Sequence, residues 1–223
     1  MSVRIQSVNL SACLAAAFLL ASCGTTNFVA QYEPWRDELE RKCLASGLVH
    51  ESPFVRTRSA LGGPSVCGAE RPFEMSAAAD GHVAMQPVAL LRCPMVNPVD
   101  DWVRNSVIPA ARHYFRAEVV GLKVAASYGC RPQNNVWGAR LSEHGHANAL
   151  DISGFELSNG RTVTLKGGWN GSPAERDFLR AVHQGACQRF TTVLGPDHDR
   201  NHRDHFHMDL ARHDSRGLRR ICK

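Results

Sequence analysis

Histidine is concentrated in two short stretches of this chain. Seven of its eleven histidines lie between residues 144 and 207, mostly in the segments 142–151 and 197–209, and both segments also contain acidic residues. A catalytic zinc ion takes three nitrogen or oxygen ligands from the protein and keeps one position open for water. The two segments therefore predict a metal site of this kind.

Two predicted strands would hold these side chains on a common surface. Residues two apart on a strand share a face. His205, His207 and Asp209 therefore face one way, while the apolar residues between them face the core. In the predicted strand 149–157, Asp151 lies on the face opposite its two apolar neighbours. The apolar sides would anchor both strands and make the polar side rigid enough for a metal.

Three helices are expected around these strands. Apolar residues recur every four positions over 34–46, which predicts a helix. A second helix is expected to begin with Asn97 as its N-cap and Pro98 in its first helical position. The segment 172–175 has the form of a capping box and is expected to open a helix over 173–188.

Outside the predicted helices, the sequence favours short strands. Residues 50–95 are expected to form short strands and loops. Further strands are expected at 117–126, 149–157, 161–165, 189–194 and 205–210. Helices that alternate irregularly with short strands are typical of the α+β class. We expect a single α+β domain, an antiparallel sheet flanked by helices and stapled by disulfides.

The N-terminus has the features of an export signal. One positive charge, Arg4, precedes an apolar run of twelve residues at 10–21. This run is too short to span a membrane and is followed by small residues. Residues 1–22 are therefore expected to be a signal peptide, and the rest of the chain an exported protein.

The end of the signal resembles a bacterial lipobox. In the sequence Leu-Ala-Ser-Cys at 20–23, cleavage would precede Cys23, which would carry lipid on its sulfur. Gly24 follows, and by the rule for such proteins this residue sends them to the outer membrane. The alternative is an ordinary signal peptide with an incidental cysteine. We expect residues 23–33 to be a lipid-anchored tether, residues 34–223 to be the domain, and the location to be the periplasm.

Six cysteines remain after the lipid-bearing one. An even number in an oxidising compartment predicts three disulfides. Fifteen pairings are possible, and we expect neighbours to pair: Cys43 with Cys67, Cys93 with Cys130, and Cys187 with Cys222.

Composition argues against a nucleic-acid partner. The chain has 26 Lys and Arg against 21 Asp and Glu, a formal net charge of +5. Its basic residues are scattered apart from a cluster near the C-terminus, whereas a nucleic-acid-binding domain has a basic stripe on a known module. We expect no nucleic acid as a partner.

The metal-ligating residues occur in a recognisable order. His144, six residues and Asp151, with Ser142 two positions upstream and His205-x-His207 downstream, resemble the signature of the LAS group of zinc peptidases. That group includes D-alanyl-D-alanine carboxypeptidases and murein endopeptidases. The wider stretch from 43 to 222 resembles the bacterial extensin-like C-terminal domain, a cysteine-bearing relative of these peptidases. This resemblance implies a fold like that of the D-alanyl-D-alanine peptidases and Zn²⁺ as the cofactor.

The resemblance also assigns roles at the metal. It implies that His144, Asp151 and His207 bind zinc. Asp204 has the offset of the catalytic acidic residue of the carboxypeptidases and would act as general base, from the loop entering the strand. In the endopeptidases, a residue matching His205 helps to stabilise the charged intermediate instead. The division of labour between these two residues stays open.

Three further residues are implied to contact substrate. The segment 128–133 resembles a conserved segment of the same peptidases, whose arginine meets a substrate carboxylate or the developing oxyanion. Arg131 would take this role, with a surface salt bridge as the alternative. Gln133 and Ser142 match neighbouring positions of the family pattern and are expected near the substrate.

The other polar residues of the two segments have no assigned role. Glu143 is expected to be solvated. A polar rim is expected, in preference to a second metal, from His146, His198, Asp199 and His202.

Three hypotheses cover these observations. We favour a zinc-dependent peptidoglycan peptidase, a D,D-carboxypeptidase or an endopeptidase, which hydrolyses an amide bond in stem or cross-link peptides. A non-catalytic peptidoglycan-binding or scaffold lipoprotein with the same fold is the alternative. A zinc hydrolase of another ester or amide is the third. The chain lacks the Ser-x-x-Lys motif of penicillin-type acylation.

Overall fold

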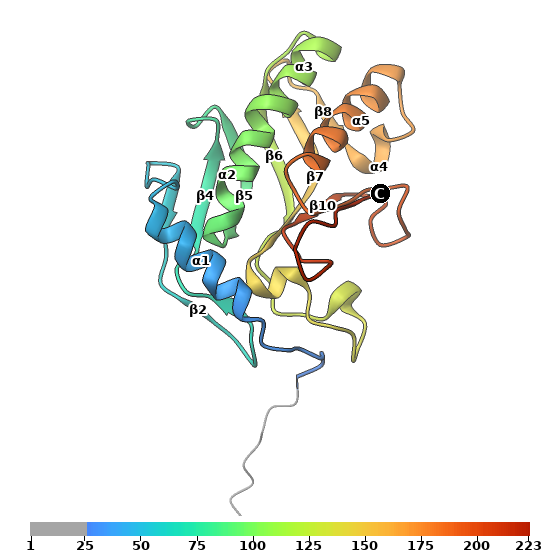
Figure 1. The fold of residues 1–223 in the computed structure, drawn as a ribbon. Coiled ribbons are helices and arrows are strands. Elements are labelled where there is room, and N and C mark those ends of the chain that lie inside the picture. Colours follow the sequence, from blue (N-terminus) through green and yellow to red (C-terminus); the bar gives the residue numbers. More distant parts are fainter. Residues whose placement is uncertain (1–25) are drawn as a thin grey trace, which may run out of the picture.

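A nine-stranded sheet forms the centre of the protein in the computed structural model, which describes residues 26–223 (Figure 1). Its strand order is β1-β4-β5-β6-β7-β10-β9-β11, with β8 paired to β7. The strands are β1 (Val55–Thr57), β4 (Phe73–Ala78), β5 (Val83–Leu91), β6 (Val119–Ala126), β7 (Ala149–Leu157), β8 (Thr162–Thr164), β9 (Thr192–Leu194), β10 (Phe206–Asp209) and β11 (Ile221–Cys222). A second, two-stranded sheet pairs β2 (Leu61–Gly62) with β3 (Gly68–Ala69).

The main sheet is largely antiparallel, as expected for the α+β class. Two pairs are parallel, β5 with β6 and β9 with β11. The first of these needs a long crossover, because parallel neighbours cannot be joined by a tight hairpin. The crossover is made by α2 (Cys93–Trp102), the π-helical turn η1 (Val103–Val107) and α3 (Ile108–Phe115).

The helices α2, α3 and α5 (Pro173–Cys187) cover one face of the sheet (Figure 1). Of the helix predictions, α1 (Pro34–Ser46) has the expected bounds, and Ser172 and Glu175 form the expected capping box of α5. The short helix α4 (Leu165–Gly168) follows β8.

The prediction that a helix begins after Asn97 was wrong. The helix α2 begins five residues earlier, with Arg92 at the N-cap and Pro98 in its interior. Pro98 removes one helical hydrogen bond. The helix continues through it because Met95 and Val99 on its inner face are fully buried, and tertiary packing outweighs local preference.

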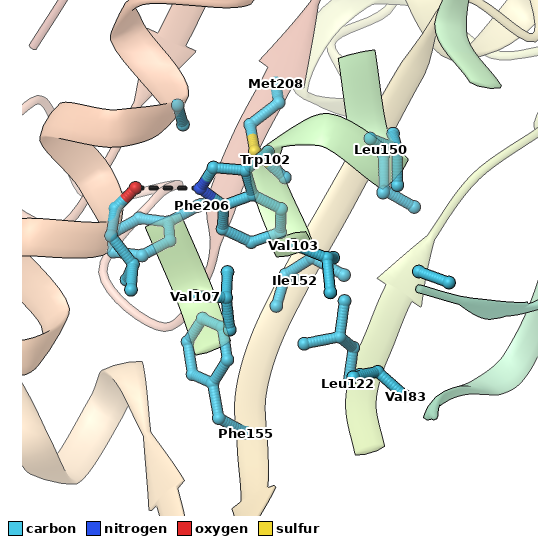
Figure 2. Close-up of a cluster of buried hydrophobic side chains, with 14 of the residues drawn as sticks. Val83, Trp102, Val103, Val107, Leu122, Leu150, Ile152, Phe155, Phe206 and Met208 are labelled. Atoms are coloured by element: carbon cyan, nitrogen blue, oxygen red, sulfur yellow. Dashed lines mark hydrogen bonds between the residues drawn. The ribbon is translucent and has the colours of Figure 1, made fainter. Parts of the chain in front are cut away.

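The core lies between this helical layer and the sheet. Figure 2 shows Trp102 of α2 against Phe155 of β7, while the Nε1 of Trp102 donates to the Val182 carbonyl of α5 at 2.8 Å. Leu150 and Ile152 of β7 are fully buried, as are Phe206 and Met208 of β10. The predicted apolar faces of these two strands are thus confirmed, and their packing fixes the residues on the reverse face.

Three disulfides staple the domain, but only one was paired correctly from the sequence. Cys187 pairs with Cys222 as expected. The other two expected pairings are wrong, because Cys43 pairs with Cys93 and Cys67 with Cys130. The first bond joins α1 to the start of α2. The second joins the end of the β2–β3 loop to the segment before the predicted metal ligands.

The first described residues are attached to the domain, unlike the tether expected over 23–33. Asn27 and Val29 form backbone hydrogen bonds with residues 138–141, and Val29 forms a parallel bridge with Arg140. Phe28 is buried against Cys67 and Leu141. The predicted signal peptide and Cys23 lie outside the described residues. Among the helices that the structure describes, none combines the length and apolarity needed to cross a membrane.

Candidate metal centre

Asp151 and His207 are direct neighbours on antiparallel strands. The register of β7 and β10 places His207 opposite Asp151, and the His207 Nδ1 lies 2.9 Å from Asp151 Oδ1. Their side chains are on the face opposite the helices, because the residues on either side of them fill the core. The pairing of two rigid strands therefore sets the distance between two of the three predicted ligands.

The third predicted ligand comes from a turn before β7. His144 lies in the 3₁₀ turn η3 (Glu143–His146), whose N-cap Ser142 accepts a hydrogen bond from the His144 backbone N–H at 3.4 Å. The His144 Nε2 lies 3.1 Å from Asp151 Oδ2 and 3.2 Å from His207 Nδ1. One ligand atom from each of the three residues thus falls within 4.8 Å of the others.

Both histidines are oriented through their other ring nitrogen. The His144 Nδ1 lies 2.5 Å from the Ser127 carbonyl, to which it donates, and the His207 Nε2 donates to Asp209 Oδ2 at 2.8 Å. Such outer partners fix the tautomer and the ring plane of a metal-ligating histidine. Each ring therefore directs its remaining nitrogen at Asp151.

Asp209 is the residue whose role the sequence did not reveal. The alternation of β10 placed it on the His207 face, but nothing in the pattern distinguished a ligand from a partner of a ligand. Its carboxylate is buried and also accepts a hydrogen bond from the Ala211 backbone N–H. The one signal that could have indicated this role is the spacing of two residues, which puts the Asp209 carboxylate beside His207 on the same face of the strand.

The charges of the centre favour a cation. Burial would raise the pKa of Asp151, but hydrogen bonds from His144 and His207 outweigh burial and hold it well below its usual range. Burial would likewise lower the pKa of His207, but Asp151 and Asp209 outweigh it and raise the pKa to about 10. The two carboxylates thus stabilise a positive charge at His207. A metal ion that binds there would displace the proton.

The donor set fits zinc. Two imidazole nitrogens and one carboxylate oxygen are a ligand set of catalytic zinc sites, which keep a fourth position for water. All three residues line a cleft of about 800 Å³, so this position would be accessible to solvent and substrate.

His205 lies beside this cluster, and Asp204 lies behind His205. The His205 Nε2 is 3.7 Å from Asp151 Oδ2, and its Nδ1 is 2.9 Å from Asp204 Oδ1. Asp204 lies on the turn that enters β10, as expected, with its side chain 65% exposed. Among the described residues that line the cleft, His205 is present and Asp204 is not. Asp204 therefore contacts His205, and His205 in turn lies next to Asp151.

The three residues expected near substrate all line the cleft. Arg131 is half-buried and forms no ion pair with any residue in the described part of the chain, so its guanidinium is available to a ligand. Gln133 begins the short 3₁₀ turn η2 (Gln133–Asn135) and is exposed. Ser142 is buried, and its backbone N–H donates to the Arg131 carbonyl at 3.0 Å.

Glu143 is paired, and the expectation that it is solvated was wrong. Arg36 of α1 binds both its carboxylate oxygens at 2.6 Å, and the Asn148 Nδ2 donates to it at 2.6 Å. The two charged side chains are only 8% and 12% exposed. This ion pair attaches α1 to the turn that carries His144.

His146 lines the cleft but does not belong to the cluster of His144, Asp151 and His207. It is buried, and burial together with the nearby charges of Arg36 and Arg92 lowers its pKa to about 3. It is therefore a neutral imidazole at physiological pH. It is not one of the three converging ligands.

Comparison with known proteins identifies one family. The model of the family described as extensin-like protein C-terminus matches residues 41–223. No curated protein and no solved structure matches the chain.

Proposed function

The chain belongs to the family of extensin-like protein C-termini, and from this premise we propose that it is a zinc-dependent peptidoglycan peptidase. The observation that carries the proposal is the convergence of His144 Nε2, Asp151 and His207 Nδ1 at the wall of an open cleft. Their order and spacing resemble those of the LAS zinc peptidases. The reaction would be hydrolysis of an amide bond in stem or cross-link peptides, by a D,D-carboxypeptidase or an endopeptidase.

Zinc bound at these ligands would supply a water that is nucleophilic at neutral pH and would polarise the scissile carbonyl. His205 is the residue we assign as proton acceptor. Its Nδ1 faces Asp204, so that the proton of the neutral ring stays on Nδ1 and Nε2 is free to accept another. We therefore assign Asp204 as a positioning residue for His205, between two roles that the sequence left open.

Arg131 is proposed to bind a substrate carboxylate. Its planar guanidinium has the geometry for two parallel hydrogen bonds to a carboxylate. Gln133 and Ser142 line the same cleft and would contact the peptide beside it. Peptidoglycan as the partner agrees with an exported protein. A lipid anchor at Cys23 would hold the protein to a membrane in the periplasm, and we propose the outer membrane.

Replacement of His205 separates a peptidase from a scaffold with the same fold. In His205→Asn we expect cleavage of purified muropeptides to fall by about 10²–10⁴-fold, the usual contribution of a general acid–base residue, with bound zinc unchanged. Asp204→Asn should show a smaller loss, because the histidine itself remains. Mass spectrometry of the muropeptides and metal analysis of each variant give both readings. Equal cleavage by His205→Asn and the unmodified protein would contradict this assignment.

A further inference from the structure

A second group of metal-ligating side chains lies on the wall of the same cleft. His198, Asp199 and His202 come from the turn between β9 and β10, and all three line the cleft. The His202 Nδ1 lies 2.8 Å from Asp199 Oδ1, and the His198 Nε2 lies 3.6 Å from Asp199 Oδ2. One ligand atom from each residue falls within 4.8 Å of the other two. No part of the proposed reaction uses these three residues.

The distances suit a tetrahedral ion. Zinc bonds to nitrogen and oxygen are about 2.0–2.2 Å long, which puts neighbouring ligand atoms of a tetrahedron about 3.4 Å apart. The two distances above, one to each carboxylate oxygen of Asp199, lie on either side of this value. An ion would therefore need only small side-chain rotations, because the three ligands come from one turn of the backbone.

His202 connects this group to the first centre. Its side chain is more than nine-tenths buried, and its ring centroid lies 5.3 Å from that of His205 and 5.9 Å from that of His207. A buried imidazole that lines a solvent-accessible cleft, with its Nδ1 beside a carboxylate, has the environment of a metal ligand and not that of a polar rim.

We propose that His198, Asp199 and His202 form a second zinc site in the cleft, weaker than the first. The affinity would be lower because the His198 and Asp199 side chains are each about one-third exposed. In addition, no residue in the described range 26–223 gives the ring of His198 an outer partner of the kind that Asp209 provides for His207. The site binds the metal whether or not the protein hydrolyses peptides.

Zinc titration of the full protein tests the site. We expect two zinc ions per chain, one tight and one weak. In Asp199→Asn and His198→Asn the weak binding should become at least about 10–100-fold weaker, since loss of a ligand costs no less than loss of an outer partner. His50→Asn, which removes an exposed histidine elsewhere, is the matched control and should bind like the unmodified protein.

A variant of the first centre makes the two sites distinguishable. Asp151→Asn should lose the tight ion and keep the weak one, so that failure of the proposed peptidase site does not affect this result. A single ion in the unmodified protein that is lost in Asp151→Asn and bound unchanged by Asp199→Asn and His198→Asn would overturn the proposal. Two ions in both Asp199→Asn and His198→Asn would also overturn it. His198→Asn decides the matter if Asp199→Asn does not fold, because the only ion pair of His198 among the described residues is with Asp199.

Discussion

The chemistry of the proposed metal centre depends on which nitrogen of each histidine is free. His144 and His207 use opposite nitrogens toward the cluster, Nε2 in the first and Nδ1 in the second. The difference follows from where their outer partners lie, a backbone carbonyl for His144 and Asp209 for His207. An outer partner thus orients the histidine ring, and decides which nitrogen is left for the metal, without contacting the metal itself.

Asp209→Asn tests this dependence. The amide can still accept the hydrogen bond of Ala211, but it lacks the charge that stabilises His207 in its orientation. We expect zinc affinity to fall by about 10–100-fold with the fold retained. Competition with a chromogenic chelator measures the affinity. Asp177→Asn, a surface carboxylate of α5, is the matched control, and equal affinity in the two variants would show that Asp209 does not support the ligand.

The direction in which a side chain faces could be predicted where the residue lies in a strand with alternating apolar residues. Alternation along β7 and β10 predicted that Asp151 and His207 leave the core, and the structure agrees. The pairing of Glu143 could not be predicted, because its partner Arg36 lies 107 residues away in the sequence. Local spacing contains no information about such a contact.

At the scale of elements, the helix α1, which is not part of the sheet, is attached to the turn that contains His144. The buried ion pair between Arg36 and Glu143 links the two. Removing one member of such a pair leaves an uncompensated charge in a poorly solvated place. The position of His144, a proposed metal ligand, therefore depends on a helix that contributes no ligand.

Arg36→Ala should lower the free energy of unfolding by about 3–5 kcal/mol. Urea unfolding, followed by circular dichroism, measures the change. The control is Lys42→Ala on the same helix, which removes an ion pair with Glu38 whose side chains are 69% and 56% exposed. Such a surface pair contributes about 1 kcal/mol at most. Similar losses in the two variants would mean that α1 does not hold the turn electrostatically.

The start of a helix was predicted correctly where neighbouring residues in the sequence determine it, and wrongly where tertiary packing determines it. The capping box of α5 is a local device, and it predicted the start of that helix. The start of α2 depends on the burial of Met95 and Val99 and on the disulfide of Cys93, none of which Asn97 and Pro98 indicate.

At the scale of the whole molecule, the disulfide pairing is determined by which parts of the chain the fold brings together. The expected neighbour pairs would close shorter loops than the observed separations of 50 and 63 residues. Doubling a loop costs only about 0.6 kcal/mol, so loop entropy cannot select between these pairings. The packing of α1 against α2 selects Cys43 with Cys93. The class of the fold followed from the sequence pattern, but this pairing depends on which helices pack together in the folded protein.

Peptide mapping of the unreduced protein tests the topology. We expect proteolytic fragments linked Cys43–Cys93, Cys67–Cys130 and Cys187–Cys222. Replacing both Cys67 and Cys130 by serine should cost about 4 kcal/mol of stability in the chain-entropy description of a loop of this size. Fragments that join Cys43 to Cys67 would contradict the arrangement of α1 and α2 described above.

The central claim is that His144, Asp151 and His207 hold a zinc ion that hydrolyses peptidoglycan peptides. Mass spectrometry of purified muropeptides, incubated with the zinc-loaded protein with and without a chelator, tests it most directly. We predict either loss of one alanine from the stem peptide or splitting of cross-linked dimers. The chelator and the Asp151→Asn variant should each abolish this reaction, and added zinc should restore it only after chelation. Muropeptides left unchanged by the folded, zinc-loaded protein would contradict the claim and favour a non-catalytic scaffold.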